Sequence, residues 1–141
     1  IIARNKGYHG VTLAAASLVY AGVVERFPAI TWALGHLGGA VPYLAERFDR
    51  GFEAYPECQE RCTVAPSQQL KAFYYDTVNF DTACLALAKG FAGADHLLAG
   101  SDYPHMIGSL STMRASIDAM ELTDEERAGV RGGNAARILR L

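Results

Sequence analysis

Apolar and polar positions change period along the chain, and this pattern predicts helices interleaved with short strands. One helix is expected over 12–27, with Thr12 as its N-cap and Pro28 as its stop. Its apolar residues lie nearly all round the helix, so we expect it to be well buried. A second is expected over 40–52, with Pro42 in its first turn, where proline is tolerated. Further helices are expected over 80–89, 109–120 and 134–139, and after a capping box of Thr123 and Glu126.

Three short apolar runs between these helices are expected to be strands: 30–34, 72–75 and 96–100. Residues 53–66 are the least regular part of the chain and are expected to form a long loop, after which Ser67 caps a short helix. The alternation of strands and helices predicts an α/β fold with a parallel sheet and right-handed crossovers.

A polar residue follows each expected strand: His36, Asp76 and Asp102. In parallel α/β folds, functional side chains gather at the carboxyl ends of the strands. We therefore expect these three side chains to point into one common mouth.

The pattern alone does not distinguish a barrel from an open, doubly wound sheet. Three strands are too few to close a barrel, and a complete (β/α)8 domain needs about 250 residues. No repeat, low-complexity tract or Gly/Ser linker divides the 141 residues. We therefore expect residues 1–141 to form a single, partial domain.

The composition of the chain disfavours two classes of partner, nucleic acids and membranes. Lys and Arg total 13 against 15 for Asp and Glu, giving a net charge of −2, so nothing attracts nucleic acid or anionic membranes electrostatically. The longest apolar stretch, 11–24, is interrupted by Thr12, Ser17 and Tyr20. It is too short and too polar for a membrane span of about 20 residues. We therefore expect a small-molecule substrate and neither nucleic acid nor membrane as a partner.

The three cysteines, Cys58, Cys62 and Cys84, leave an odd thiol and imply no disulfide framework. A zinc site at Cys58 and Cys62 lacks a second ligand pair nearby, so reduced cysteines in a cytoplasmic protein are the simpler interpretation. A doubly wound nucleotide-binding domain is also disfavoured, because no glycine-rich phosphate-binding motif follows any expected strand.

Three segments are more specific together than any one of them alone: HLGG at 36–39, GSDYPH at 100–105 and GNAARIL at 133–139. With RFP at 26–28 and FYYDT at 73–77, their order and spacing resemble the amidohydrolase-related family that includes aminocarboxymuconate-semialdehyde decarboxylase and γ-resorcylate decarboxylase. The resemblance extends from about residue 11 to residue 141. It implies the C-terminal part of a (β/α)8 barrel, strands six to eight, preceded by the fifth helix.

The resemblance also implies roles for individual residues. Asp102 matches the eighth-strand aspartate that binds the metal, a divalent ion expected to be zinc, with manganese as the alternative. His36 matches a sixth-strand histidine that polarises the substrate or positions water. Arg47 matches an arginine that in some decarboxylases reaches a substrate carboxylate, in some cases across a dimer interface. His105 would line the pocket, and Asp76 would either line it too or cap the following helix.

Each of these residues also has a purely structural interpretation. An aspartate in a turn commonly bonds backbone amides, and a histidine before glycines is commonly a satisfied polar group. The resemblance favours the functional interpretation for Asp102 and His36. Arg47, with Glu46 and Asp49 beside it, is more simply a solvated or ion-paired side chain.

The chain departs from the family pattern in one large respect. Family members carry H-x-H or E-x-H on the first strand and a histidine on the fifth, and this chain has no H-x-H. His9, the one early histidine, is expected in a loop before a helix. Because a catalytic zinc takes three protein ligands and a water, the remaining ligands must come from other sequence or another chain.

Two hypotheses follow. The first is a metal-dependent enzyme acting on a small carboxylated or cyclic organic molecule, a decarboxylase slightly more than a hydrolase because HLGG, Pro42-Tyr43 and Arg47 resemble the decarboxylases. The second is a truncated, non-catalytic fragment or half-barrel. Because exposed sheet edges favour association, we expect a homo-oligomer or binding to the missing barrel half.

Overall fold

A computed structural model describes residues 6–141 and contains a short parallel sheet in the order β1-β2-β3. The strands are β1 (Ala33–Leu34), β2 (Tyr74–Asp76) and β3 (Leu97–Leu98). β2 is central: Tyr75 pairs with Leu34 on one side and with Leu97 on the other. The predicted parallel α/β arrangement is confirmed, although each strand is shorter than the apolar run that predicted it.

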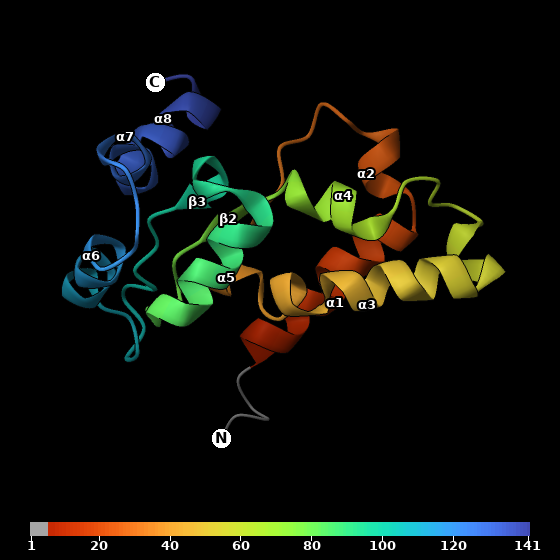
Figure 1. Cartoon of the computed structure of the whole chain (residues 1–141), viewed down its shortest axis with the longest axis horizontal. Helices are drawn as coiled ribbons and strands as arrows, with labels where there is room; N and C mark the ends of the chain where they lie inside the picture. Colours follow the sequence, from red (N-terminus) through yellow and green to blue (C-terminus); the bar gives the residue numbers. More distant parts are fainter. Residues whose placement is uncertain (1–5) are drawn as a thin grey trace.

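Helices lie on both sides of this sheet. In Figure 1, α1 to α4 lie together on one side of β2 and β3, and α6 to α8 lie on the other. The helices are α1 (Lys6–Tyr20), α2 (Val23–Arg26), α3 (Val41–Ala54), α4 (Pro66–Lys71), α5 (Thr82–Ala92), α6 (Leu110–Asp118), α7 (Asp124–Ala128) and α8 (Asn134–Leu139). Short 3₁₀ turns cover His36–Gly38, Pro56–Gln59 and Ala94–His96, and one π turn covers Gly129–Gly133.

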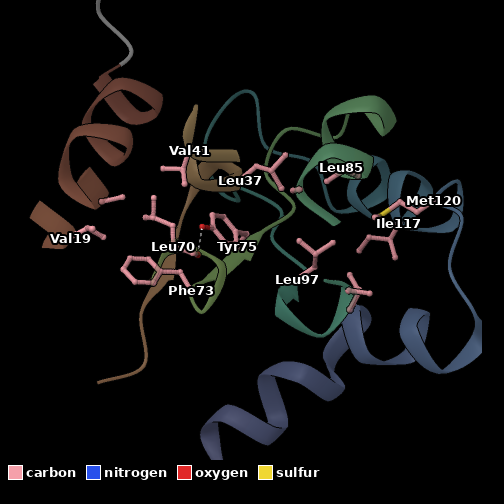
Figure 2. Packing of buried hydrophobic residues seen from close by; sticks show 14 of the residues in the cluster. Val19, Leu37, Val41, Leu70, Phe73, Tyr75, Leu85, Leu97, Ile117 and Met120 are labelled. Atoms are coloured by element: carbon pink, nitrogen blue, oxygen red, sulfur yellow. Dashed lines mark hydrogen bonds between the residues drawn. The ribbon is translucent and has the colours of Figure 1, made fainter. Parts of the chain in front are cut away.

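The core is centred on the middle strand. The Tyr75 side chain is fully buried, and its hydroxyl donates a hydrogen bond of 2.7 Å to the Leu70 carbonyl. Figure 2 shows Tyr75 between Val19 of α1 on one side and Ile117 of α6 on the other. Each large side chain buried in this way contributes about 1.5–3 kcal/mol, so the cluster holds the helices of both sides against the sheet.

The first helix differs from its prediction. It begins before Thr12, so Thr12 is not an N-cap; its hydroxyl donates to the Tyr8 carbonyl (2.8 Å) and accepts from the Ala40 amide (2.9 Å). The helix ends at Tyr20 because Gly22 adopts a left-handed φ of 66°. The sequence signal at Thr12 therefore marks a tertiary contact to the start of α3.

The prediction that this helix is well buried is also wrong. Within α1, Ala15 and Val19 are fully buried, whereas Leu13 is about half exposed. His9 lies inside α1 and is exposed, so its predicted place in a loop is wrong as well.

Other helix starts are confirmed in part. The capping box of α7 is present, because Thr123 Oγ1 accepts from the Glu126 amide and the Glu126 carboxylate accepts from the Thr123 amide. Ser67 does not cap α4; the helix starts at Pro66, and the Ser67 amide donates to Asp49 (2.8 Å) instead. None of the helices within residues 6–141 combines the length and apolar character needed to cross a bilayer.

Candidate active site

The carboxyl ends of the three parallel strands lie at one edge of the sheet. His36 follows β1 after a single glycine, Asp76 is the last residue of β2, and Asp102 follows β3 by four residues. A hollow of about 430 Å³ at this edge is lined by His36, Asp102, His105, Met106 and Ile107. The structure therefore brings three of the predicted site residues together.

Both principal candidates have left-handed backbones. His36 has φ 53° and Asp102 has φ 56°, which costs about 1–2 kcal/mol for residues that carry a Cβ. The turn after His36 continues with positive φ at Leu37, Gly38 and Gly39. A Cβ at Gly38 would lie 2.5 Å from the Tyr75 ring, so the HLGG segment needs glycine there for space as well as for conformation. Strained backbone of this kind concentrates at functional sites.

Asp76 makes a different set of contacts from those predicted. Its Oδ2 accepts from the His36 amide (3.1 Å), and its Oδ1 accepts from the amides of Leu37 (2.8 Å) and Val78 (3.0 Å). The alternative that Asp76 caps the following helix is wrong, because Asp81 caps α5. A substrate-binding role for Asp76 stays a prediction; in this structure its carboxylate faces backbone amides and does not line the hollow.

Burial raises the pKa of Asp76 above its ordinary value of 3.8, because it disfavours the charged form. The three amide hydrogen bonds and the nearby His36 act in the opposite direction and are the smaller effects. The carboxylate is therefore a half-buried charge that depends on its amide donors.

Tyr8 of α1 packs against the His36 imidazole, with the ring centroids 5.2 Å apart and tilted by 37°. Its hydroxyl donates to the Val78 carbonyl at 3.3 Å. Burial, followed by the negative charges of Asp102 and Asp76, raises the pKa of Tyr8, so it stays a neutral donor. The sequence analysis missed this residue, because no spacing signal connects a helix position with a turn that follows a strand elsewhere in the chain.

The reactive atoms of the two principal candidates have no protein partner. Within residues 6–141, no group donates a hydrogen bond to the Asp102 carboxylate, and the His36 imidazole makes none. Both residues are partly exposed, so their polar atoms face the hollow and solvent and are available to bind a ligand.

These residues fit only part of a metal site. Asp102 offers a carboxylate, the ligand type that manganese prefers and zinc accepts. No cluster of three or more His, Cys, Asp or Glu side chains suited to a metal occurs in the described part of the chain. A metal bound at Asp102 would therefore need further ligands from outside residues 6–141.

Arg47 lies on α3 and is exposed, away from the hollow. Its neighbours bond elsewhere: Glu46 pairs with Arg50 (2.6 Å), and Asp49 accepts from Ser67. Arg47 has no ion-pair partner among residues 6–141, so it is solvated in this structure.

The sequence analysis also missed Met106 and Ile107, which form the apolar side of the hollow. Met106 is fully exposed and Ile107 is two-thirds exposed. The available signal was their position directly after His105 in the loop that follows the GSDYPH segment.

A family model described as amidohydrolase matches residues 8–141. The chain belongs to the amidohydrolase family. The predicted resemblance is thereby confirmed. The chain spans 36% of a 2-amino-3-carboxymuconate-6-semialdehyde decarboxylase from Dictyostelium discoideum (28% identical over 92% of this chain). It spans 41% of a 6-methylsalicylic acid decarboxylase from Penicillium expansum (27% identical over 92% of this chain).

Solved structures of family members have the same fold over this region. A 5-carboxyvanillate decarboxylase from Sphingomonas paucimobilis matches with a TM-score of 0.80 and 26% identity, over 90% of this chain and 38% of that one. A dihydroxybenzoic acid decarboxylase from Polaromonas sp. JS666 matches with a TM-score of 0.79 and 25% identity, over 92% of this chain and 40% of that one. The latter structure contains manganese and the inhibitor 2-nitroresorcinol.

Proposed function

We propose that this chain forms strands six to eight of the (β/α)8 barrel of a metal-dependent decarboxylase acting on a small aromatic or similarly unsaturated carboxylic acid. The observation that carries the proposal is the hollow lined by His36 and Asp102, whose reactive atoms have no hydrogen-bond partner within residues 6–141. The names of the relatives, which are decarboxylases of carboxylated phenols or of a carboxymuconate semialdehyde, support the substrate class.

In this proposal Asp102 holds the metal together with ligands from outside residues 6–141. When bound, a divalent ion polarises substrate oxygens and lowers the pKa of a bound water to about 7. Manganese is favoured over zinc, because manganese is the ion in the dihydroxybenzoic acid decarboxylase structure.

The residues of this chain then orient the substrate and move a proton. The bond between the ring carbon and the carboxylate breaks, CO2 leaves, and the ring carbon receives a proton that Asp102 Oδ helps to deliver. The His36 imidazole hydrogen-bonds the substrate from the β1 side, and His105 binds it at the rim. Met106 and Ile107 pack against its apolar face. Arg47 reaches a substrate only across a subunit interface, because it does not line this hollow.

A hydrolase is the near alternative, because the same groups serve it. Asp102 would take a proton from water, and His36 would bind the carbonyl of a lactone. Product analysis separates the two reactions. With manganese present, we expect CO2 release from carboxylated phenols and no ring opening of lactones.

The control for this experiment is a pair of histidine variants. We expect His36→Ala to lower CO2 release about 100-fold or more, as for loss of a positioned acid–base group, and His9→Ala, on the exposed face of α1, to leave it unchanged. Lactone opening without CO2 release would identify a hydrolase and reject the decarboxylase.

A second candidate is a non-catalytic part that works only with the missing barrel half. The absence of a three-ligand cluster within residues 6–141 favours it. So do β1 and β3, each of which has one unpaired edge in the described sheet and would pair with barrel strands or a second copy. The cytoplasmic location that we also propose agrees with three free cysteines.

Metal content by elemental analysis, measured beside the intact mass and light scattering, tests this candidate. A tightly bound equivalent of manganese or zinc in a monomer of 15.2 kDa would reject it. No metal, together with a self-associated chain of that mass, would support it.

A further inference from the structure

We infer that Asp76 and Thr77, the adjacent residues at the end of β2, act as positioning residues that set the placement of His36 relative to Asp102. The inference rests on the proposed function for its catalytic meaning, but its structural content does not. Asp76 holds the turn after β1, Thr77 holds the end of β3, and β2 lies between these two strands.

The first contact is an anion-binding turn. His36 and Leu37 are consecutive residues with left-handed φ values of 53° and 54°, and their amides point at the two oxygens of Asp76. Successive amides in such conformations form a concave site for an anion. Asp76 is the anion in this case, and its hydrogen bonds offset the strain that keeps His36 facing the hollow.

The three amide hydrogen bonds to Asp76 require two accepting oxygens, which a carboxylate provides. An asparagine could accept from Leu37 and Val78 with its oxygen, but its NH2 group would then face the His36 amide, donor against donor. Gly100 lies close to this side chain: a Cβ at position 100 would be 2.9 Å from the Asp76 Cβ, so a larger residue there would displace Asp76.

The second contact is the Thr77 hydroxyl. Thr77 is fully buried, and its Oγ1 accepts from the Gly100 amide (3.1 Å) and donates to the Gly100 carbonyl (3.3 Å). One side chain thus satisfies both backbone groups of the residue that lies two positions before Asp102.

The loop beyond Gly100 transmits this contact to Asp102. The Ser101 carbonyl accepts from the Ser109 amide (2.8 Å), and the Asp102 carbonyl accepts from the His105 amide (2.9 Å). Gly108 packs against the Asp102 backbone so closely that a Cβ there would collide with it. Asp102 is therefore held within a hydrogen-bonded loop that begins directly after the residue bound by Thr77.

Asp81→Asn is a matched control for Asp76→Asn. The Asp81 carboxylate also accepts two amide hydrogen bonds, each of 3.0 Å, but at the start of α5 and away from the hollow. Both substitutions remove a charge, but at position 81 a single amide oxygen can still accept from both amides, so only Asp76→Asn loses a contact, the one to the His36 amide.

The first test is NMR of the protein without metal, recording the His36 imidazole signals in wild type and both variants. We expect Asp76→Asn to move the ring signals of His36 and the amide signals of His36 and Leu37, and Asp81→Asn to leave all of them in place. A folded Asp76→Asn protein with unchanged His36 ring signals would overturn the inference.

A pH titration of the wild type covers the case in which Asp76→Asn does not fold. The amides of His36, Leu37 and Val78 should shift with one common midpoint, which is that of the Asp76 carboxylate. The ring signals of His36 should shift at the same midpoint, because Asp76 holds the turn that carries the ring. Amide shifts at that midpoint without any response of the ring would overturn the inference.

Variants at Thr77 test the second contact, the one between Thr77 and Gly100. Thr77→Ser keeps the hydroxyl and should keep the Asp102 signals, whereas Thr77→Val, of the same shape, should move them. Equal spectra for the two variants would overturn this part.

With a carboxylated phenol as substrate, Asp76→Asn should lower kcat about 100-fold with little change in KM, since misplacement by about 1 Å has this effect. If wild type releases no CO2 while the NMR results hold, the proposed function fails and the positioning role stands.

Discussion

Two carboxylates in this molecule, those of Asp76 and Glu25, each accept hydrogen bonds from a loop that is distant in sequence. Asp76 holds the turn at 36–39, and Glu25 of α2 holds the loop before α4. Glu25 accepts from the Thr63 amide (2.8 Å), the Val64 amide (3.2 Å) and Gln69 Nε2 (3.0 Å), and from the Thr63 hydroxyl (2.6 Å). Glu25 with these three partners is called the Glu25 cluster below.

The two carboxylates differ in whether a reactive side chain remains unbound beside them. In the Glu25 cluster the hydrogen bonds run between the loop at 63–64, α4 and α2, and all four are accepted by the two carboxylate oxygens of Glu25. At the strand ends, Asp76 accepts a hydrogen bond from the backbone amide of His36 and none from its ring. The imidazole therefore remains free beside Asp102. The same interaction therefore stabilises a loop in one place and presents a reactive group in the other.

The largest expected effect is that of Asp102→Asn on activity. The substitution keeps the shape and removes the charge that would hold the metal and the proton, so we expect CO2 release to fall 100-fold or more. We expect the free energy of unfolding to change by less than about 0.5 kcal/mol, because the carboxylate has no hydrogen-bond donor within residues 6–141.

Activity assays and urea unfolding check both halves of this prediction, with Glu121→Gln, at an exposed residue outside the helices, as the control that changes neither. A large loss of stability in Asp102→Asn would mean that Asp102 is a structural turn residue, which would remove the contrast with the Glu25 cluster.

Glu25→Gln should show the opposite pattern. A hydrogen bond to a charged group contributes about 1.5–3 kcal/mol, and solvent at this partly exposed side chain reduces the net loss to about 1 kcal/mol. We expect that decrease in the free energy of unfolding, measured in urea, with no change in activity. Glu46→Gln, which breaks an exposed pair with Arg50, is the matched control and should have no measurable effect. A loss of activity in Glu25→Gln with stability intact would contradict the division of roles.

The sequence indicated the parts of this fold that depend on local signals. Alternating runs predicted the parallel sheet, and the Thr123 signal predicted the capping box. The strand-end rule placed His36 and Asp102 at one hollow. The predicted helix caps at Thr12 and Ser67 were wrong. A threonine or serine before an apolar run gives the same sequence pattern whether its polar groups bond to its own helix or to another element.

Contacts between distant segments account for what the sequence did not indicate. Nothing in the composition pairs Asp76 with the amides of His36, or Tyr8 with its ring, because those contacts depend on a left-handed turn that forms only when α1, β1 and β2 meet. The further ligands that the proposed metal would need could not be predicted either, because no cluster of three suitable side chains occurs within residues 6–141.

The two carboxylates should respond to pH with opposite sign. The hydrogen bond from Thr63 is the main cause that lowers the pKa of Glu25 below 4.5, so its stabilisation is complete above pH 4.5 and is lost as pH falls through the lowered pKa. Burial raises the pKa of Asp76 above 3.8, so the folded state binds the proton more tightly, and stability falls as pH rises from 3.8 through the raised pKa.

Urea unfolding at a series of pH values checks this prediction. Glu25→Gln should reduce the loss of stability on acidification below pH 4.5, whereas Asp76→Asn should remove a decrease that occurs on raising the pH above 3.8. If both variants changed the pH dependence in the same direction, Asp76 would be a stabilising carboxylate like Glu25.

The most local of the expected effects is at Thr123, whose capping contacts lie within four residues of the chain. Thr123→Ala removes the hydroxyl that accepts from the Glu126 amide (3.2 Å), and loss of an N-cap of this kind costs about 1 kcal/mol. Thr123→Ser keeps the acceptor and should retain the wild-type free energy of unfolding. Because α7 does not contribute to the hollow, neither variant should change activity or the His36 spectrum. A change at His36 would mean that the strand ends are coupled to the C-terminal helices, and that the separation between a reactive and a stabilising region is not complete in this fold.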